Sequence, residues 1–159
     1  MNLKLIYALI LTVLPVSELR IGLPVAVLYA IEENIPVIFI FSLVVLLNIL
    51  LIFFVFYFLD NLHNIFMKLE FYKKIFNKYM KRFQKKVDNF EKTYSSWGFL
   101  ALVLFVGIPI PGTGVWAGSL VSWLLGLNRK KSILAISIGV LIAGIFILLG
   151  TLGFINFLL

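Results

Sequence analysis

Cysteine is absent from the chain, histidine occurs once, and charged residues are scarce. Without cysteine the protein cannot form disulfides, use a thiolate nucleophile or bind a metal through sulfur. The lone His63 is too little for a histidine-based metal site, and no aspartate lies within an apolar segment. We therefore expect no metal, no cofactor and no enzymatic activity.

The shortage of charge points to a membrane protein. Only 13% of the 159 residues are charged and 62% are hydrophobic, with a mean hydropathy of +1.10. A soluble domain carries about 25% charged residues. The composition predicts a multi-pass, all-α integral protein of the cell membrane, for which membrane lipids rather than nucleic acid are the expected partners of the +7 net charge.

Two apolar runs are long enough to cross a membrane. Residues 35–59 and 132–152 contain 25 and 21 residues, none of them charged. At 1.5 Å per residue, a helix of either length crosses a hydrocarbon core of about 30 Å. Both segments are predicted to be transmembrane helices.

Two further apolar segments, residues 3–31 and 97–127, are interrupted by helix breakers. Each arm beside an interruption is shorter than the ~20 residues that a spanning helix needs. Proline removes a backbone donor, and glycine permits tight turns. The breakers are Pro15, Gly22 and Pro24 in the first segment and Pro109, Pro111, Gly112 and Gly114 in the second. We predict two re-entrant helical hairpins, each of which enters the membrane, turns and leaves on the same side.

The basic residues support this topology. Of the 14, nine lie within 68–92 and three more are at 129–131. If each hairpin returns to its starting side, these 12 residues share one face, which the positive-inside rule makes cytoplasmic. If the hairpins were full crossings, residues 129–131 would lie opposite the basic stretch. We therefore expect residues 60–94 and 128–131 in the cytoplasm and both termini outside.

The order of hairpin and span occurs twice, so the predicted fold is an inverted repeat within one membrane domain, residues 1–159. The first repeat covers residues 1–59 and the second covers residues 95–159. Between them, in residues 60–94, apolar side chains recur at three- and four-residue steps among lysines and arginines. This connector is predicted to be an amphipathic cytoplasmic helix, either lying on the lipid surface or packed as a solvated helix on the hairpins.

Glu18 and Arg20 are the sharpest functional signal. A charged side chain near the middle of a bilayer costs about 2.5–3.5 kcal/mol on insertion scales, so such residues face a cavity or each other. Two interpretations stay open: an ion pair that pins the hairpin tip, or a site for substrate and protons. Asn48, within the first span, either makes an interhelical hydrogen bond or lines the cavity.

The stretch GIPIPGTGVWAGS, residues 107–119, is the second signal. A helix N-terminus favours anions, so the amides after Gly112 and the Thr113 hydroxyl are candidates for binding one; alternatively, proline and glycine only shape the turn. Gly114 and Gly118 have the spacing of closely packed helices, and Trp116 is a packing residue or an interface anchor. The candidate substrate or proton site comprises Glu18, Arg20, Asn48, Pro109, Pro111, Gly112, Thr113 and Gly114. The candidate turn and packing residues are Pro15, Gly22, Pro24, Trp116 and Gly118.

Three stretches resemble the small multidrug export protein family: LPVSELRIGLPVAV, FVGIPIPGTGVWAGSLVSWLLGL and LAISIGVLIAG. The resemblance covers nearly the whole chain, although Ile21 stands where that family usually has a small residue. The family is thought to be distantly related to the DedA, or VTT-domain, membrane proteins. This resemblance implies an inverted repeat of re-entrant hairpin plus helix, and it makes a lipid-like anionic substrate and proton dependence plausible.

Three functions remain open on this basis. The first is a transporter or flippase-like protein for a small or lipid-like anionic substrate, in which Arg20 and the turn amides bind the anion and Glu18 couples to protons. The second is a small multidrug/proton antiporter, although the strong basic bias favours a single fixed orientation. The third is a membrane structural or assembly factor that transports nothing. Association into a homo-oligomer is compatible with each.

Overall fold

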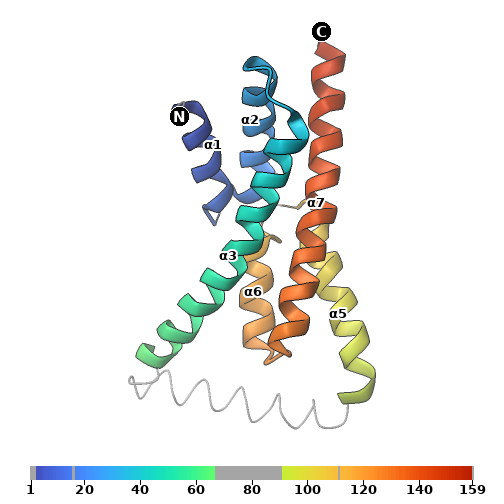
Figure 1. Cartoon of the computed structure of the whole chain (residues 1–159). Helices are drawn as coiled ribbons and strands as arrows, with labels where there is room; N and C mark the ends of the chain where they lie inside the picture. The colour runs from blue at the N-terminus through green and yellow to red at the C-terminus, as the bar shows by residue number, and fades with distance from the viewer. Residues whose placement is uncertain (1–2, 16, 67–90, 111, 159) are drawn as a thin grey trace.

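The computed structural model describes residues 3–15, 17–66, 91–110 and 112–158, and every regular element among them is a helix (Figure 1). In chain order these are α1 (Leu3–Val13), α2 (Glu18–Glu32), α3 (Val37–Phe66), α5 (Glu91–Gly107), α6 (Val115–Leu124) and α7 (Arg129–Leu158). The prediction of an all-helical protein is confirmed for this part of the chain. The predicted connector falls largely on residues 67–90, which lie outside the described residues, as does Pro111.

Helices α3 and α7 are both long and apolar enough to cross a membrane. The qualifying stretches are Val37–Asn61, with 25 residues and a mean hydropathy of 3.1, and Arg129–Phe157, with 29 residues and a mean hydropathy of 2.8. Only 33% of the most apolar window in each helix is buried inside the protein. Most of each helix therefore turns apolar side chains outward, as lipid-facing helices do and as soluble monomers rarely do. These helices coincide closely with the two predicted spans.

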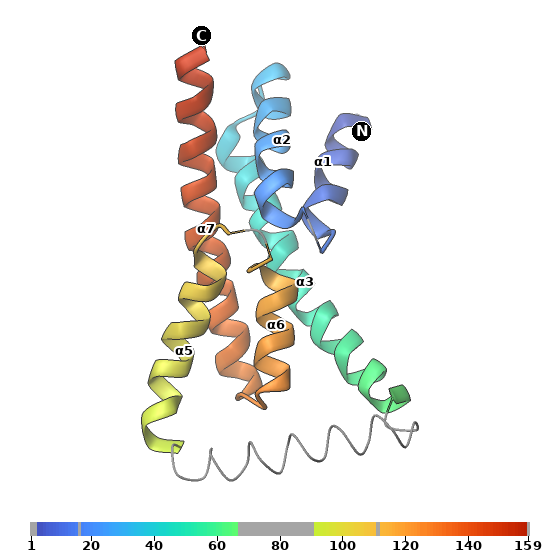
Figure 2. The same ribbon diagram turned by 180° about the vertical axis from the view of Figure 1, so that it is seen from behind.

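The four shorter helices form two hairpins at opposite ends of the molecule (Figures 1 and 2). Helices α1 and α2 double back beside the first half of α3, and α5 and α6 double back beside the first half of α7. Helices α3 and α7 run in opposite directions, so α2 also packs against α7 and α6 against α3. The turns of the two hairpins point toward each other and meet near the middle of the molecule.

Each hairpin ends in the same backbone motif, which reverses the chain into the long helix that follows. After α2 the left-handed residue is Asn34, with φ of 56°, and after α6 it is Gly126, with φ of 62°. The next amides, of Ile35 and Leu127, donate back to carbonyls five residues earlier at 2.8 and 3.0 Å. This is the Schellman arrangement, which satisfies carbonyl groups left free at a helix end.

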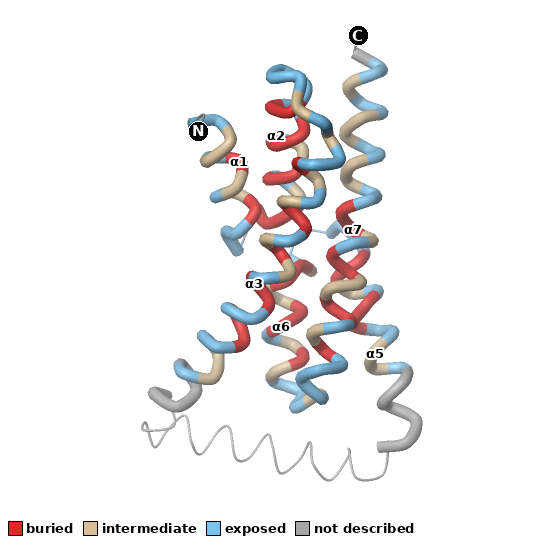
Figure 3. The backbone as a smooth tube through the Cα atoms, viewed as in Figure 1, coloured by how far each residue is buried: buried red, intermediate tan, exposed pale blue. Residues whose placement is uncertain are grey.

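Buried residues are concentrated where the hairpins meet the long helices (Figure 3). Glycines permit close approach at two of these contacts. A Cβ on Gly22 would lie 2.7 Å from the backbone nitrogen of Thr12, and a Cβ on Gly118 would lie 2.6 Å from Cγ2 of Val106. Both distances are under the 3.0 Å that real Cβ atoms keep, so a larger residue at either position would force the helices apart.

The first hairpin turns over fewer residues than its breakers indicate. Helix α2 begins at Glu18 and continues through Gly22 and Pro24, so both predicted breakers lie inside a helix and not in the turn. A proline within a helix removes one backbone hydrogen bond, and helices packed among neighbours tolerate this loss. Pro15 does lie in the turn between α1 and α2.

Candidate functional site

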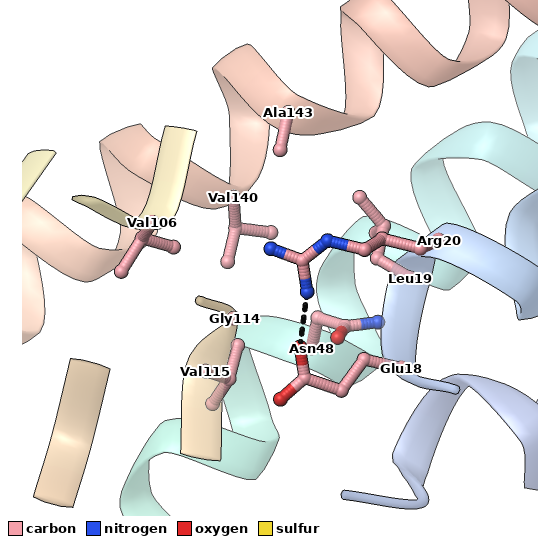
Figure 4. Close-up of a pocket in the computed structure, with 9 residues that line it drawn as sticks. All are labelled: Glu18, Leu19, Arg20, Asn48, Val106, Gly114, Val115, Val140 and Ala143. Carbon is pink, nitrogen blue, oxygen red and sulfur yellow. Dashed lines mark hydrogen bonds and ion pairs between the residues drawn. The ribbon is translucent and has the colours of Figure 1, made fainter. Parts of the chain in front are cut away.

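Glu18 is the first residue of α2 and lies at the point where the two hairpins meet. Its side chain is only 4% exposed, and its φ of 42° is unusual for a residue other than glycine. The left-handed backbone occurs where the turn passes into α2. The carboxylate points from the first hairpin toward the second (Figure 4).

The Glu18 carboxylate binds one partner in each hairpin. Its Oε2 accepts a hydrogen bond from Arg20 Nη1 at 3.0 Å, within the first hairpin. Its Oε1 accepts one from the backbone amide of Trp116 at 3.1 Å, in the second hairpin. Trp116 is the second residue of α6, whose own N-cap, Gly114, has no side chain. Glu18 therefore caps α6 from outside, and its negative charge faces the positive end of that helix.

Arg20 makes the second connection between the hairpins. Its Nη2 donates to Thr113 Oγ1 at 2.6 Å and lies 3.5 Å from the carbonyl oxygen of Ile108. The Thr113 hydroxyl accepts a hydrogen bond from Arg20 and donates its own hydrogen to the Ile110 carbonyl oxygen at 2.8 Å. The Arg20 side chain is 13% exposed, so the guanidinium is shielded and holds the turn of the second hairpin in place.

Trp116 makes a third connection, because its indole Nε1 donates to the carbonyl oxygen of Val13 at 3.0 Å. Val13 is the last residue of α1, where helix carbonyls lack partners within the helix. Backbone and side chain of one tryptophan therefore bind both sides of the first turn. Gly114 leaves the room that this requires, since a Cβ there would overlap the Glu18 carboxylate.

A small pocket lies beside the ion pair. Its walls come from both hairpins and both long helices (Figure 4). The residues that line it are Glu18, Leu19, Arg20, Asn48, Val106, Gly114, Val115, Val140 and Ala143. The pocket is small and partly open to the surroundings.

The predicted site residues divide into two groups. Glu18, Arg20, Asn48 and Gly114 share the pocket, and Thr113 contacts it through Arg20. Pro109 and Gly112 are exposed and do not line the pocket. Gly112 has a φ of 88°, which favours glycine, so its place in the turn follows from backbone conformation.

A second polar cluster was not predicted from the sequence. Asp60 Oδ1 accepts from Trp123 Nε1 at 2.9 Å, and Asp60 Oδ2 pairs with Arg129 Nη2 at 2.8 Å. The Arg129 guanidinium also lies 4.8 Å from the ring centre of Phe56. The available signal was positional: Asp60 follows one apolar run and Arg129 precedes the other. The pair places the end of α3 beside the start of α7.

The first hairpin has its own ion pair at its open end. Lys4 Nζ lies 2.7 Å from Glu32 Oε2, which joins the start of α1 to the end of α2. The Glu32 carboxylate raises the pKa of the Lys4 ammonium, first through their hydrogen bond and then through charge attraction. Both side chains are exposed. The pair closes the open end of the first hairpin.

The central site pairs one negative charge with one positive charge. Glu18 supplies the only carboxylate among the residues that line the pocket, and Arg20 supplies the only cation. When Glu18 takes up a proton, the guanidinium and the N-terminus of α6 lose their counter-charge. No group of three or more potential metal ligands occurs among the described residues.

The comparisons with known proteins agree with the membrane character of the fold. A family model described as "Putative small multi-drug export protein" matches residues 18–146. That match includes both elements of the central site, from Glu18 to the turn before α6. No curated protein and no solved structure shows significant similarity to the chain. Since the family model covers most of its length, the protein belongs to the small multi-drug export protein family.

Proposed function

We propose that the protein is a transporter of the cell membrane that moves a small or lipid-like anion together with protons. The observation that carries the proposal is the buried Glu18–Arg20 pair, which touches both hairpins at their meeting point. Charges buried among apolar helices are costly and commonly mark substrate or proton pathways. The family's description as export proteins supports transport, and the anionic substrate follows from the charges of the site.

The proposed coupling follows from the partners of Glu18. In its charged form, Glu18 occupies both Arg20 and the α6 amide that an anion would use. Protonation of the Glu18 carboxylate removes that competition, so proton binding and anion binding reinforce each other. By linkage the effect is reciprocal: a bound anion also favours the protonated form of Glu18. Transport should therefore become faster as the pH on the loading side falls.

The proposed membrane topology is an inverted repeat of two re-entrant hairpins and two spans. Three features support it. The hairpins lie at opposite ends of the molecule, α3 and α7 run in opposite directions, and both hairpins end in the same Schellman motif. The Asp60–Arg129 pair puts the end of the first span beside the start of the second. With the positive-inside rule, this end faces the cytoplasm and both termini lie outside.

A multidrug/proton antiporter is the second candidate, and the family description favours it. Such a protein binds cations and releases them when a membrane carboxylate takes up a proton. In this chain Arg20 lies 3.0 Å from Glu18 and would repel a cationic substrate. The charge of the site therefore favours an anion over a cationic drug.

Transport by purified protein in proteoliposomes tests the proposal. The probes are fluorescently labelled phosphatidylglycerol as the anion, labelled phosphatidylcholine as the zwitterion, and ethidium as the drug-like cation. We expect movement of phosphatidylglycerol that rises at lower pH, with little movement of the other two. Transport of ethidium alone would favour the antiporter, and movement of no probe at any pH would contradict the proposal.

Two variants separate a proton site from a scaffold. Glu18→Gln keeps the size and the acceptor oxygen but cannot titrate, so it should fold and lose the pH dependence. Arg20→Ala should strongly reduce the transport rate of the anionic probe, and it should change the shape of the pH profile less. If Glu18→Gln is stable and transports with an unchanged pH profile, proton coupling through Glu18 is wrong and the ion pair only holds the hairpins together.

A further inference from the structure

Three helices run from the central pocket to the second polar cluster. Each of α3, α6 and α7 packs against the other two, and α6 lies between the lower halves of α3 and α7 (Figures 1 and 2). At the cluster these helices contribute Asp60, Trp123 and Arg129. The pocket and the cluster are therefore the two ends of one seam between the three helices. The residues at the pocket end are, in the same helix order, Asn48, Val115 and Val140.

The side of α6 that faces this seam carries a buried hydroxyl halfway along it. Val115, Ser119 and Trp123 are four residues apart, which places them on one face of the helix. Val115 lines the pocket and Trp123 bonds Asp60. Ser119 is 0% exposed, and four residues at 1.5 Å each put it about 6 Å along the helix from either end of the seam.

Two polar atoms of the seam have no protein partner within the part of the chain that the structure describes. They are Oγ of Ser119 and Oδ1 of Asn48, and Asn48 is also 0% exposed. The Asn48 Nδ2 already donates to the Val44 carbonyl oxygen at 2.9 Å. Native proteins pair the great majority of buried polar atoms with protein or with ordered water, because an unsatisfied one is costly. Water is the partner that suits both atoms.

The seam has a carboxylate at each end. The Asp60 side chain is 42% exposed and pairs with Arg129, so it is in contact with the surrounding water. The Glu18 side chain is 4% exposed, pairs with Arg20 and lines the pocket. A proton that moves between the two ends passes no other charged side chain of the neighbouring helices. Their uncharged stretches are residues 48–59 of α3, 97–107 of α5, 115–124 of α6 and 132–140 of α7.

We infer that Glu18 exchanges protons with the water at the Asp60 end of the molecule through a row of water molecules held by Ser119 and Asn48. The inference rests on the proposed function, in which Glu18 binds and releases a proton. Hydrogen-bonded oxygens lie about 2.8 Å apart, so one or two waters bridge each step of about 6 Å along α6. Ser119 and Asn48 act as positioning residues for this row.

The transfer needs no further reactant. Each water oxygen in the row accepts one proton and releases another. The net step moves one proton between bulk water and a Glu18 carboxylate oxygen and leaves every other group unchanged. In the proposed topology the Asp60 end faces the cytoplasm, so Glu18 responds to the pH of the cytoplasm and not to the pH outside.

Experimental density maps of the full-length protein, at a resolution that shows ordered water, test the row directly. In the wild type we expect one water at Ser119 Oγ and another at Asn48 Oδ1. Ser119→Ala should lose the first water and keep the second. Ser137→Ala is the matched control and should keep both, because the Ser137 hydroxyl already donates to the Ile133 carbonyl oxygen at 2.8 Å. A wild-type map that lacks either water would overturn the inference.

Proteoliposomes in which all molecules share one orientation test the proton exchange. A fall in pH on the side of Asp60 should raise the movement of labelled phosphatidylglycerol several-fold, and the same fall on the opposite side should change it little. Ser119→Ala should reduce this response several-fold, whereas Ser137→Ala should keep it. An equal response from both sides would overturn the inference. If the lipid does not move at any pH, the proposed function fails instead, and the density maps still decide whether the row of waters exists.

Discussion

Gly114→Ala is the smallest change that should separate the two hairpins. Gly114 lies directly before α6, where the Glu18 carboxylate passes into the second hairpin. An added Cβ would overlap that carboxylate: even its farther oxygen, Oε1, would be only 2.7 Å away. The φ of Gly114, −86°, suits alanine, so the effect comes from crowding and not from backbone strain.

The loss of folding stability follows from the hydrogen bonds that the displaced Glu18 carboxylate can no longer make. Glu18 must give up its bonds to Arg20 and to the Trp116 amide. Breaking a buried ion pair costs about 3–5 kcal/mol. Because Arg20 keeps its bond to Thr113, we expect the lower end, about 3 kcal/mol. For a protein of this size, that loss lowers the unfolding temperature by about 6–12 °C.

Thermal unfolding of the purified protein measures this loss. Gly150→Ala is the control, since a Cβ at Gly150, in the C-terminal third of α7, meets nothing within 4 Å. This variant should leave stability unchanged or raise it by up to about 1 kcal/mol. Glu18→Ala removes the obstacle, so the double variant should be no less stable than Glu18→Ala alone, within about 0.5 kcal/mol. A stable Gly114→Ala protein, or losses that simply add, would refute this reasoning.

Two further substitutions test the other links of the structure by thermal unfolding. Trp116→Phe keeps the backbone bond to Glu18 but loses the indole donor to Val13; it should destabilise by about 0.5–1.5 kcal/mol, and an unchanged unfolding temperature would mean that this bond contributes nothing. Asp60→Asn keeps an acceptor for Trp123 but loses the ion pair with Arg129. The Asp60 side chain is 42% exposed and the Arg129 side chain 49%. The cost of this substitution should be at most about 1 kcal/mol and should shrink in high salt; a large, salt-independent loss would show that the pair is not solvent-screened.

Local sequence features were enough to find the helices and the turns. The length and polarity of the uncharged runs can be read directly from the sequence, and these two properties determine whether a helix can cross a membrane. Pro109 and Gly112 affect the backbone only within a few residues, because proline lacks a backbone N–H and glycine adopts positive φ. The positions of the two turns could therefore be predicted, but not all helix bounds: α2 continues through Gly22 and Pro24, and α5 begins at Glu91, before the predicted start of the second hairpin at residue 97.

The partners of the site residues could not be predicted in the same way. Glu18 and Trp116 are 98 positions apart, and Asp60 and Arg129 are 69 apart. Such contacts depend on how whole helices pack, which no local pattern contains. Composition indicated that Glu18 and Arg20 would need partners in an apolar setting. It did not indicate that the partner of Glu18 is the Trp116 amide of α6 or that the partner of Arg20 is Thr113. It also did not indicate that Gly114 leaves space for the Glu18 carboxylate.

The orientation of the two hairpins in the membrane is the claim on which the midplane site depends. Since the chain contains no cysteine, single-cysteine variants at positions 34, 77, 128 and 156 can be labelled with a membrane-impermeant reagent in intact cells and in inverted vesicles. Re-entrant hairpins predict that positions 77 and 128 react only from the cytoplasmic side and that positions 34 and 156 react only from outside. Labelling of positions 77 and 128 from opposite sides would contradict re-entrance and remove Glu18 and Arg20 from the middle of the membrane.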